Sequence, residues 1–266
     1  MFSAPSFFDL SDFAHSALFA GSEPVWAALN QLKDYMNRLD YGQLRHEQLR
    51  DGVPLPCPLI FHEGTLQTAE GCEIVYGDTN KGKLRVSRDG QDLPGASVIM
   101  AGAVLMGSRI LLGKGVLIES GALIKEPAVF GDCTEVRQGA YVRGYCLTGR
   151  RCVIGHATEV KHSIFLNDSK AGHFAYLGDS ILGGAANLGA GTKFANLRFL
   201  PGNVQIKTPS GPIDSGLRKF GAILGDRAQT GCNSVTNPGT LLGFDSLLLP
   251  NTTAPSGYHP PRSVLR

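Results

Sequence analysis

Three basic residues recur in the sequence at intervals of 18 residues: Lys125, Arg143 and Lys161. Each directly follows an aliphatic residue. If the fold stacks these positions, the cations line up about 5 Å apart, and an anion such as a phosphate would relieve their repulsion. His173 follows Lys161 after twelve residues, and an imidazole is suited to proton transfer near neutral pH. The alternative is that the three long side chains spread apart into solvent.

A six-residue repeat could bring these positions together. From Met106 to Leu166 every sixth residue is large and apolar except Thr148, and the residue two places earlier is usually small or β-branched. The period returns at Leu182 and again from Leu224 onwards. A helix repeats every ~3.6 residues and a strand every two, so neither explains this pattern. Hexapeptide repeats are typical of a parallel β-helix.

We therefore predict a mainly β protein, a left-handed parallel β-helix of hexapeptide repeats with a small N-terminal helical segment. Each hexapeptide supplies one short strand and one corner, and three of them make a turn of 18 residues. One turn cannot bury its own inner face, so stacked turns supply the core. The left-handed coil is an exception to the usual right-handed crossover.

The pattern divides the chain into three parts. Residues 1–52 form the N-terminal helical segment, in which Ser22-Glu23-Pro24 resembles a helix start; we expect it to cap the first turn. Residues 53–99 contain lead-in strands or irregular first turns, and residues 100–266 form the β-helix. The repeat breaks at about 199–221, where we expect a loop or hairpin. Apolar residues at helical spacing in the first part are Trp26, Leu29, Leu32, Tyr35 and Leu39.

Composition argues against several classes of protein. The net charge of +2 gives no reason to expect binding to nucleic acid or to an acidic membrane. No apolar run approaches the ~20 residues of a membrane helix. The first apolar residues lack a preceding basic region, so we expect no signal peptide and a cytoplasmic protein. The cysteines form no CxxC pair and are expected to be reduced and mostly buried: Cys57, Cys72, Cys133, Cys146, Cys152 and Cys232.

The segments EVKH, AGHFAY and ANLGAGTKFAN resemble a known family. They are similar to the left-handed β-helix acetyltransferase domain of the bifunctional glucosamine-1-phosphate N-acetyltransferase/UDP-N-acetylglucosamine pyrophosphorylase. The resemblance is most specific over residues 141–196 and extends loosely from about 100 to 250. It implies a homotrimer that transfers an acetyl group from acetyl-CoA to an amino sugar 1-phosphate, without a metal, in nucleotide-sugar and cell-envelope precursor biosynthesis.

The resemblance also implies roles for individual residues. His173 matches the catalytic base of the family. The substrate-binding positions match Arg143, Lys161, Tyr176, Asn187, Asn196 and Lys219, of which the first two hold the sugar phosphate. The acetyl-CoA positions match Ala190, Cys232 and Leu249.

Some positions depart from the family pattern. The family has a serine where this chain has Cys232, and a small residue where it has Leu249. The family arginine near the C-terminus that meets the cofactor has only Arg262 as a counterpart. No Gly-rich L-x-x-G-x-G-T-R loop is present, so we expect no pyrophosphorylase half. The sugar-phosphate side is therefore better preserved than the acetyl-CoA side.

Two other functions stay open. The first is a sugar-phosphate or nucleotide-sugar binding module that has lost acetyl transfer, which the altered acetyl-CoA side favours. The second is a metal-dependent carbonic anhydrase, because that activity also occurs on left-handed β-helices. It would need three converging histidines, and His156, His162 and His173 do not have the expected spacing.

Overall fold

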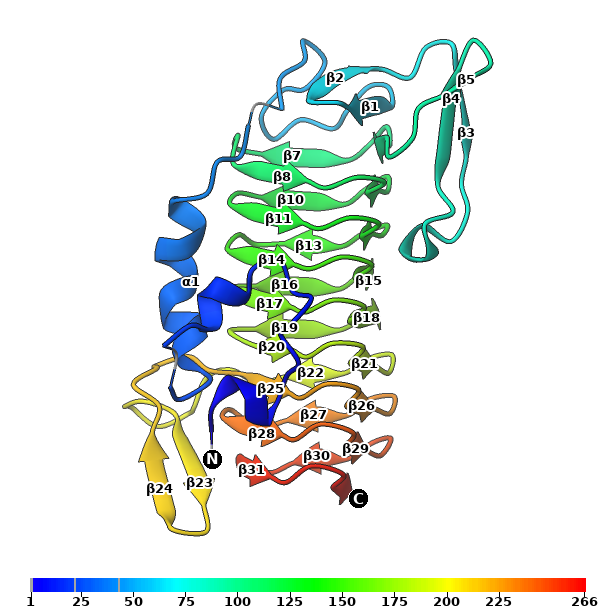
Figure 1. Cartoon of the computed structure of the whole chain (residues 1–266). Coiled ribbons are helices and arrows are strands. Elements are labelled where there is room, and N and C mark those ends of the chain that lie inside the picture. The colour runs from blue at the N-terminus through cyan, green and yellow to red at the C-terminus, as the bar shows by residue number, and fades with distance from the viewer. Residues whose placement is uncertain (1, 22, 43) are drawn as a thin grey trace.

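The computed structural model describes residues 2–21, 23–42 and 44–266. Its main body is a parallel β-helix, in which short strands stack into three long sheets along one axis (Figure 1). Successive strands visit the three sheets in turn, so each turn of the chain adds one strand to each sheet. The predicted fold, a mainly β parallel β-helix with a small N-terminal helical segment, is confirmed.

We name the sheets face A, face B and face C, in the order in which the chain visits them. Face A has eleven strands: β2 Thr65–Thr68, β1 Leu59–His62, β6 Ser97–Ile99, β9 Leu117–Ile118, β12 Glu135–Val136, β15 Val153–His156, β18 Lys170–His173, β21 Asn187–Leu188, β26 Gln229–Thr230, β29 Leu247–Leu248 and β32 Val264–Leu265. Face B has eight strands: β7 Val104–Met106, β10 Leu123–Lys125, β13 Tyr141–Val142, β16 Glu159–Lys161, β19 Tyr176–Gly178, β22 Lys193–Phe194, β27 Val235–Thr236 and β30 Thr253–Ala254. Face C has eight strands: β8 Ile110–Leu112, β11 Ala128–Phe130, β14 Cys146–Thr148, β17 Ser163–Phe165, β20 Ile181–Leu182, β25 Ala222–Leu224, β28 Thr240–Leu242 and β31 Gly257–His259.

The core runs along the axis of the β-helix. Ile118, Val136 and Ile154 of face A pair in register and are completely buried. Burying one such side chain stabilises a fold by about 1.5–3 kcal/mol. A period of six follows, because each strand sends one side chain, in most cases an apolar one, into this shared interior.

The inward-facing series differs from the predicted one at both ends. Leu105, not Met106, pairs with the inward-facing Ile124, because the corner between β7 and β8 is one residue longer than the next. Phe165 pairs with Thr148 and lies in the inner core. Leu166 points away from the axis of the β-helix and is buried against the N-terminal segment. The prediction that Met106 and Leu166 point inward was wrong.

The corner between face B and face C is shortened twice. Cys146 pairs with Ser163 and Ile164 pairs with Ile181, so each of these turns has 17 residues. The first of these corners is one residue shorter at His162, and the second is one residue shorter at Asp179. The two residues have positive φ angles of 47° and 52°. Together they account for the slip of two residues that the repeat shows before Leu182.

The N-terminal segment covers face C. Its helices, η1 Ala4–Ser6, η2 Ser16–Phe19 and α1 Ala27–Asn37, run along the side of the β-helix (Figure 1). The end of the segment covers the first turn as expected, because Leu44 lies in the axial core and the Gly52 N–H donates to the carbonyl of Leu105. Leu29 and Leu32 of α1 are completely buried in one cluster with Leu147 and Ile164 of face C. Of the expected helix start, Ser22 lies outside the described residues, and α1 begins after it.

Two segments leave the β-helix. The strands β3 Cys72–Val75, β4 Arg85–Arg88 and β5 Gln91–Asp92 form an antiparallel arm beside face A, with η3 Thr79–Lys81 between β3 and β4 (Figure 1). The strands β23 Gln205–Thr208 and β24 Gly211–Asp214 form a hairpin between β22 and β25. An isolated bridge pairs Leu197 with Lys219 and closes this insertion.

The cysteines are less buried than predicted. Of the six, only Cys146 and Cys152 are buried, Cys232 is exposed and the rest are intermediate. Burial raises the pKa of Cys146 and of Cys152 to about 12, so both are inert thiols at neutral pH. In the described ranges, no helix is long and apolar enough to cross a membrane.

Candidate active site

The basic ladder exists in the backbone register. Ile124 pairs with Val142, and Val142 pairs with Val160. The residues that follow them, Lys125, Arg143 and Lys161, therefore stack where face B turns into face C.

Each cation of the ladder already has a partner within the chain. Arg143 forms an ion pair with Glu159 at 2.7 Å, and Lys161 lies 3.2 Å from Asp179. Lys125 lies over the ring of Tyr141, 5.5 Å from its centroid. These contacts offset the repulsion that we expected a bound anion to relieve, so the ladder by itself does not require a ligand.

Asp179 is the centre of this corner. Its carboxylate accepts hydrogen bonds from Lys161 Nζ at 3.2 Å and Asn196 Nδ2 at 2.6 Å, and His162 Nδ1 lies at 2.9 Å. Burial alone would raise the pKa of Asp179. The hydrogen bond to His162 and the charge of Lys161 outweigh it and hold that pKa below its ordinary value of 3.8. Asp179 is therefore ionised at neutral pH and fixes the position of the surrounding groups.

The irregular chain path builds this cluster. The two shortened corners put His162 and Asp179 directly above one another, because Lys161 pairs with Gly178. The insertion after β22 returns through the bridge between Leu197 and Lys219, and the N–H of Phe220 donates to the carbonyl of Asn196. Lys219 thereby comes close to Lys161, although 58 residues separate them in the sequence.

These residues surround a cavity of about 400 Å³, which we call the cationic pocket. Its lining contains Lys33, Arg143, Gly144, Tyr145, Lys161, His162, Asp179, Arg218 and Lys219. Three predicted substrate-binding residues, Arg143, Lys161 and Lys219, thus share one cavity. Sequence reasoning missed Lys33 and Arg218. The position of Arg218 next to Lys219 was a usable signal, whereas no feature of the sequence links Lys33 to this corner.

Tyr176 and Asn196 lie beside the cationic pocket. A Cβ atom placed on Gly178 would lie 2.4 Å from Asn196 Nδ2 and 2.7 Å from the Tyr176 hydroxyl, so both side chains close over this glycine. Burial raises the pKa of Tyr176, and the nearby Glu159 and Asp179 raise it further. Tyr176 is therefore a neutral phenol that can donate a hydrogen bond to a ligand.

His173 is the last residue of β18 in face A, and it lies where face A turns into face B. This edge of face B is opposite the edge that carries the cationic pocket. His173 is exposed and stacks on His156, with ring centroids 5.7 Å apart. His173 precedes Gly178, the partner of Lys161, by five residues. At about 3.3 Å per residue, the two positions are at most ~16 Å apart along face B. His173 and the cationic pocket therefore flank one face, with Tyr176 between them.

The predicted acetyl-CoA residues lie along the edge that holds His173. His173, Ala190 and Cys232 occupy equivalent positions in successive turns, because Ala171 pairs with Leu188 and Leu188 with Thr230. The Ala190 N–H donates no hydrogen bond within the part of the chain that the structure describes, so it can bind a thioester carbonyl. Leu249 is 37% exposed. One backbone donor and an open apolar edge fit a thioester.

Asn187 lies apart from the cationic pocket. It begins β21, its side chain is exposed, and it pairs with Lys170 of β18. Since successive residues of a strand point to opposite sides and its neighbour Leu188 is buried, Asn187 faces outward from face A. The residues predicted to bind substrate therefore lie on both sides of the edge that holds His173. Asn187 is on face A, whereas the residues of the cationic pocket are at the far edge of face B.

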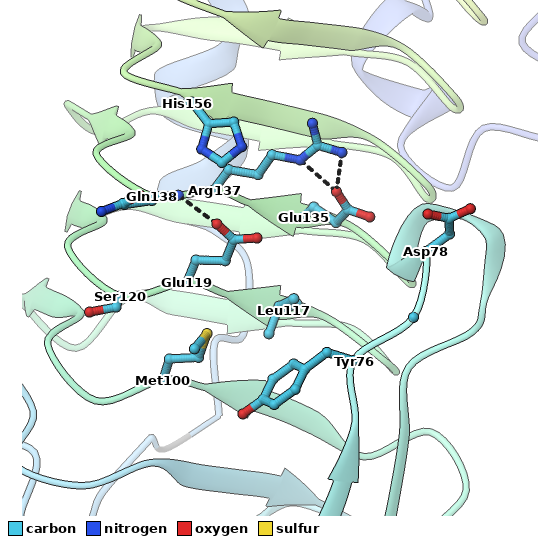
Figure 2. Close-up of a pocket in the computed structure, with 11 residues that line it drawn as sticks. Tyr76, Asp78, Met100, Leu117, Glu119, Ser120, Glu135, Arg137, Gln138 and His156 are labelled. Atoms are coloured by element: carbon cyan, nitrogen blue, oxygen red, sulfur yellow. Dashed lines mark hydrogen bonds and ion pairs between the residues drawn. The ribbon is translucent and has the colours of Figure 1, made fainter.

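A second cavity, of about 450 Å³, lies between the antiparallel arm and face A; we call it the arm pocket (Figure 2). Glu135 anchors the arm by accepting hydrogen bonds from the backbone and side chain of Asn80 at 2.9 Å and 2.8 Å. Glu119, Glu135 and Asp78 line this cavity, and Arg137 is paired with Glu135. The arm pocket is therefore poorly suited to a phosphate, and the cationic pocket is the better anion site.

The three histidines of the carbonic anhydrase alternative lie at two different corners. His156 and His173 stack at one edge of face B, whereas His162 binds Asp179 at the other. Among the residues with described positions, no group of three His, Cys, Asp or Glu side chains could hold a metal ion. One chain alone therefore offers no metal site built from these histidines.

Comparison with known proteins points to one group of enzymes. No family profile matches the chain. A bifunctional sugar-1-phosphate nucleotidylyltransferase/acetyltransferase from Sulfurisphaera tokodaii is 38% identical over 111 residues, which are 42% of this chain and 28% of that protein. The bifunctional protein GlmU of Methanocaldococcus jannaschii is 38% identical over 104 residues, 39% of this chain and 25% of its own length. GlmU of a Picosynechococcus species is 31% identical over 123 residues, 46% of this chain and 24% of its length.

The chain thus spans about a quarter of the length of the curated relatives that it matches. The resemblance predicted from the motifs is confirmed: the chain is similar to GlmU-type proteins over about 40% of its length, and its β-helix fits a hexapeptide-repeat acetyltransferase domain.

Proposed function

We propose that this protein is an acetyl-CoA-dependent N-acetyltransferase that acts on an amino sugar 1-phosphate of the glucosamine-1-phosphate type. Its place would be in the cytoplasmic biosynthesis of nucleotide-sugar and cell-envelope precursors. The observation that carries the proposal is the cationic pocket, which gathers Arg143, Lys161 and Lys219 from three separate segments. The GlmU-type relatives support the same chemistry.

In the proposed reaction the phosphate binds in the cationic pocket and the sugar lies across face B, over Tyr176. The protonated amine cannot attack a carbonyl, so His173 takes its proton as general base. The free amine then attacks the thioester carbon, and the Ala190 N–H stabilises the oxyanion that forms. Collapse of this intermediate breaks the C–S bond and releases the thiolate of coenzyme A. The nitrogen passes its second proton to that thiolate, which leaves an amide and coenzyme A, and His173 returns the first proton to solvent. Charge-assisted hydrogen bonds to the phosphate hold the amine in line for attack.

The assembly that we propose is a homotrimer. Face C is covered by the chain's own N-terminal segment, so contacts between copies would have to use face A, face B or the edge between them. That edge carries His173 and the predicted acetyl-CoA residues. A neighbouring copy would therefore border the acetyl-CoA side of the site. Light scattering that finds a stable monomer at micromolar concentration would contradict this arrangement.

A mass-spectrometric assay tests the proposed activity. The protein is incubated with acetyl-CoA and a panel of amino sugar phosphates, and the expected product is 42 Da heavier than its acceptor because one acetyl group replaces one hydrogen. His173→Ala should lower the rate by about 10²–10⁴-fold while it changes sugar-phosphate binding only slightly. Equal rates for parent and variant would remove His173 from the reaction.

The binding module without acetyl transfer is the second candidate. It is favoured by the contrast between the two sides of the site: five cationic side chains line the phosphate side, whereas the acetyl-CoA side offers Cys232 and Leu249. Sugar-phosphate binding that depends on Lys161, without any acetylated product from the whole panel, would select this function.

A further inference from the structure

Helix α1 contributes a residue to the cationic pocket. Its inner side is fixed on face C by Leu29, Leu32 and Met36, all completely buried. At its end, Asn37 accepts a hydrogen bond from Arg109 at 2.8 Å. Lys33 therefore has a defined position: it lines the pocket, and its Nζ lies 5.5 Å from the centroid of the Tyr145 ring.

The pocket holds more positive charge than its own acids neutralise. Two of its five cations, Arg143 and Lys161, have carboxylate partners. The other three, Lys33, Arg218 and Lys219, form no ion pair within residues 2–21, 23–42 and 44–266. Like charges gathered in one cavity repel unless an anion joins them. Three unpaired cations exceed what one phosphate monoester, with a charge of about −2, balances.

The cations come from three parts of the chain, and Lys219 lies next to Arg218 in the insertion. Arg143 and Lys161 belong to the ladder at the end of face B. Lys33 comes from α1, and Arg218 from the returning end of the insertion. The cavity of about 400 Å³ between them is far larger than one phosphate group.

We propose that the cationic pocket binds two linked phosphate groups, one on Arg143, Lys161 and Lys219, and the second on Lys33 and Arg218. This rests on the proposed function, because the first position is the phosphate site of the acceptor. The ligand class is a diphosphate-linked amino sugar, such as a nucleoside diphosphate sugar. The N-terminal segment then sets specificity by supplying the cation that distinguishes a diphosphate from a monophosphate.

Calorimetric titration of the full chain with inorganic phosphate and with pyrophosphate, at one ionic strength, tests this. Lys33→Gln and Arg218→Gln should each weaken pyrophosphate binding by about tenfold or more, near the lower limit for hydrogen bonds to charged groups, and phosphate binding by at most about twofold. Lys33 and Arg218 are exposed, so neither substitution threatens the fold.

The controls remove the same charge elsewhere. Arg38→Gln changes a cation directly after α1 that donates to the carbonyl of Asp34. Lys207→Gln changes an exposed cation of β23. Neither lines the cationic pocket, and neither should lower the preference for pyrophosphate. If Lys33→Gln and Arg218→Gln weaken both anions equally, or behave like these controls, the second phosphate position does not exist.

Turnover separates this inference from the proposed function. Lys33→Gln should lower kcat/KM for uridine diphosphate glucosamine by about tenfold and for glucosamine 1-phosphate much less. If the parent acetylates only the monophosphate and Lys33→Gln leaves pyrophosphate binding unchanged, the inference fails and the proposed function stands. If pyrophosphate binding depends on Lys33 but no acceptor is acetylated, the proposed function fails and the diphosphate site stands.

Discussion

Face B and face C are built from the same repeat but carry opposite outward surfaces. On each strand, the residue before the inward-facing one points outward from the β-helix. On face C these outward residues are all apolar or aromatic: Leu111, Val129, Leu147, Ile164, Ile181, Ile223, Leu241 and Tyr258. On face B five of the eight corresponding residues are polar or amphipathic, and the full series is Val104, Leu123, Tyr141, Glu159, Tyr176, Lys193, Val235 and Thr253.

This difference decides what each face binds. An apolar column that long is unstable in water, and here the chain's own N-terminal segment buries it together with Val204, Ile206 and Phe220 of the insertion. The column of face B stays open and carries Glu159 and Tyr176 next to the cationic pocket. The repeat therefore specifies a scaffold, and the residue one place away from the core assigns each face to packing or to a ligand.

The largest expected effect concerns stability. Leu147→Ala on face C should lower the free energy of unfolding by about 2–5 kcal/mol, because it leaves a cavity under the N-terminal segment. Lys193→Ala occupies the equivalent outward position on face B and is exposed, so it should change that free energy by less than about 0.5 kcal/mol. Urea titrations of both variants measure the two values. Similar losses would show that the faces do not differ in this way.

The next effect concerns binding on face B. Lys161→Ala should weaken binding of glucosamine 1-phosphate by about 1.5–3 kcal/mol, the range for a hydrogen bond to a charged group. Glucosamine without phosphate should be affected much less. Lys125→Ala, one ladder position further from the pocket, should have a smaller effect, since Lys125 does not line it. Calorimetric titrations decide, and equal losses for both ligands would reduce the ladder to a solvated edge.

The smallest effect is the dependence of stability on pH through Asp179. Its pKa is lowered in the folded state, so its contribution to stability is present above its ordinary pKa of 3.8 and is lost as the pH falls through the lower folded value. Asp179→Asn should cost about 1 kcal/mol at about pH 7 and less at about pH 3. Unfolding measured at both pH values tests this; a difference that grows on acidification would contradict it.

Local spacing predicted much of the site. The ladder residues Lys125, Arg143 and Lys161 stack as their 18-residue interval predicted. In a regular β-helix, residues one full turn apart lie next to each other in neighbouring strands. The apolar column of face C was equally readable, since Leu111, Val129 and Leu147 share that interval. This apolar column would have predicted that another part of the chain covers face C. Asp179 also shares this interval, because it follows Lys161 by 18 residues. What spacing does not predict is the shortened corner, which pairs Lys161 with Gly178 and places His162 beside Asp179.

By itself, the sequence determined the β-helix, its core and the edges on which Lys161 and His173 lie, because a period of six repeats one local geometry from turn to turn. Only the tertiary structure decided which distant segments complete the site. Lys33 reaches the cationic pocket through the packing of α1 on face C, and Lys219 through the closure of an insertion. Neither contact has a sequence period, because each depends on non-local burial and on a bridge between distant backbone segments.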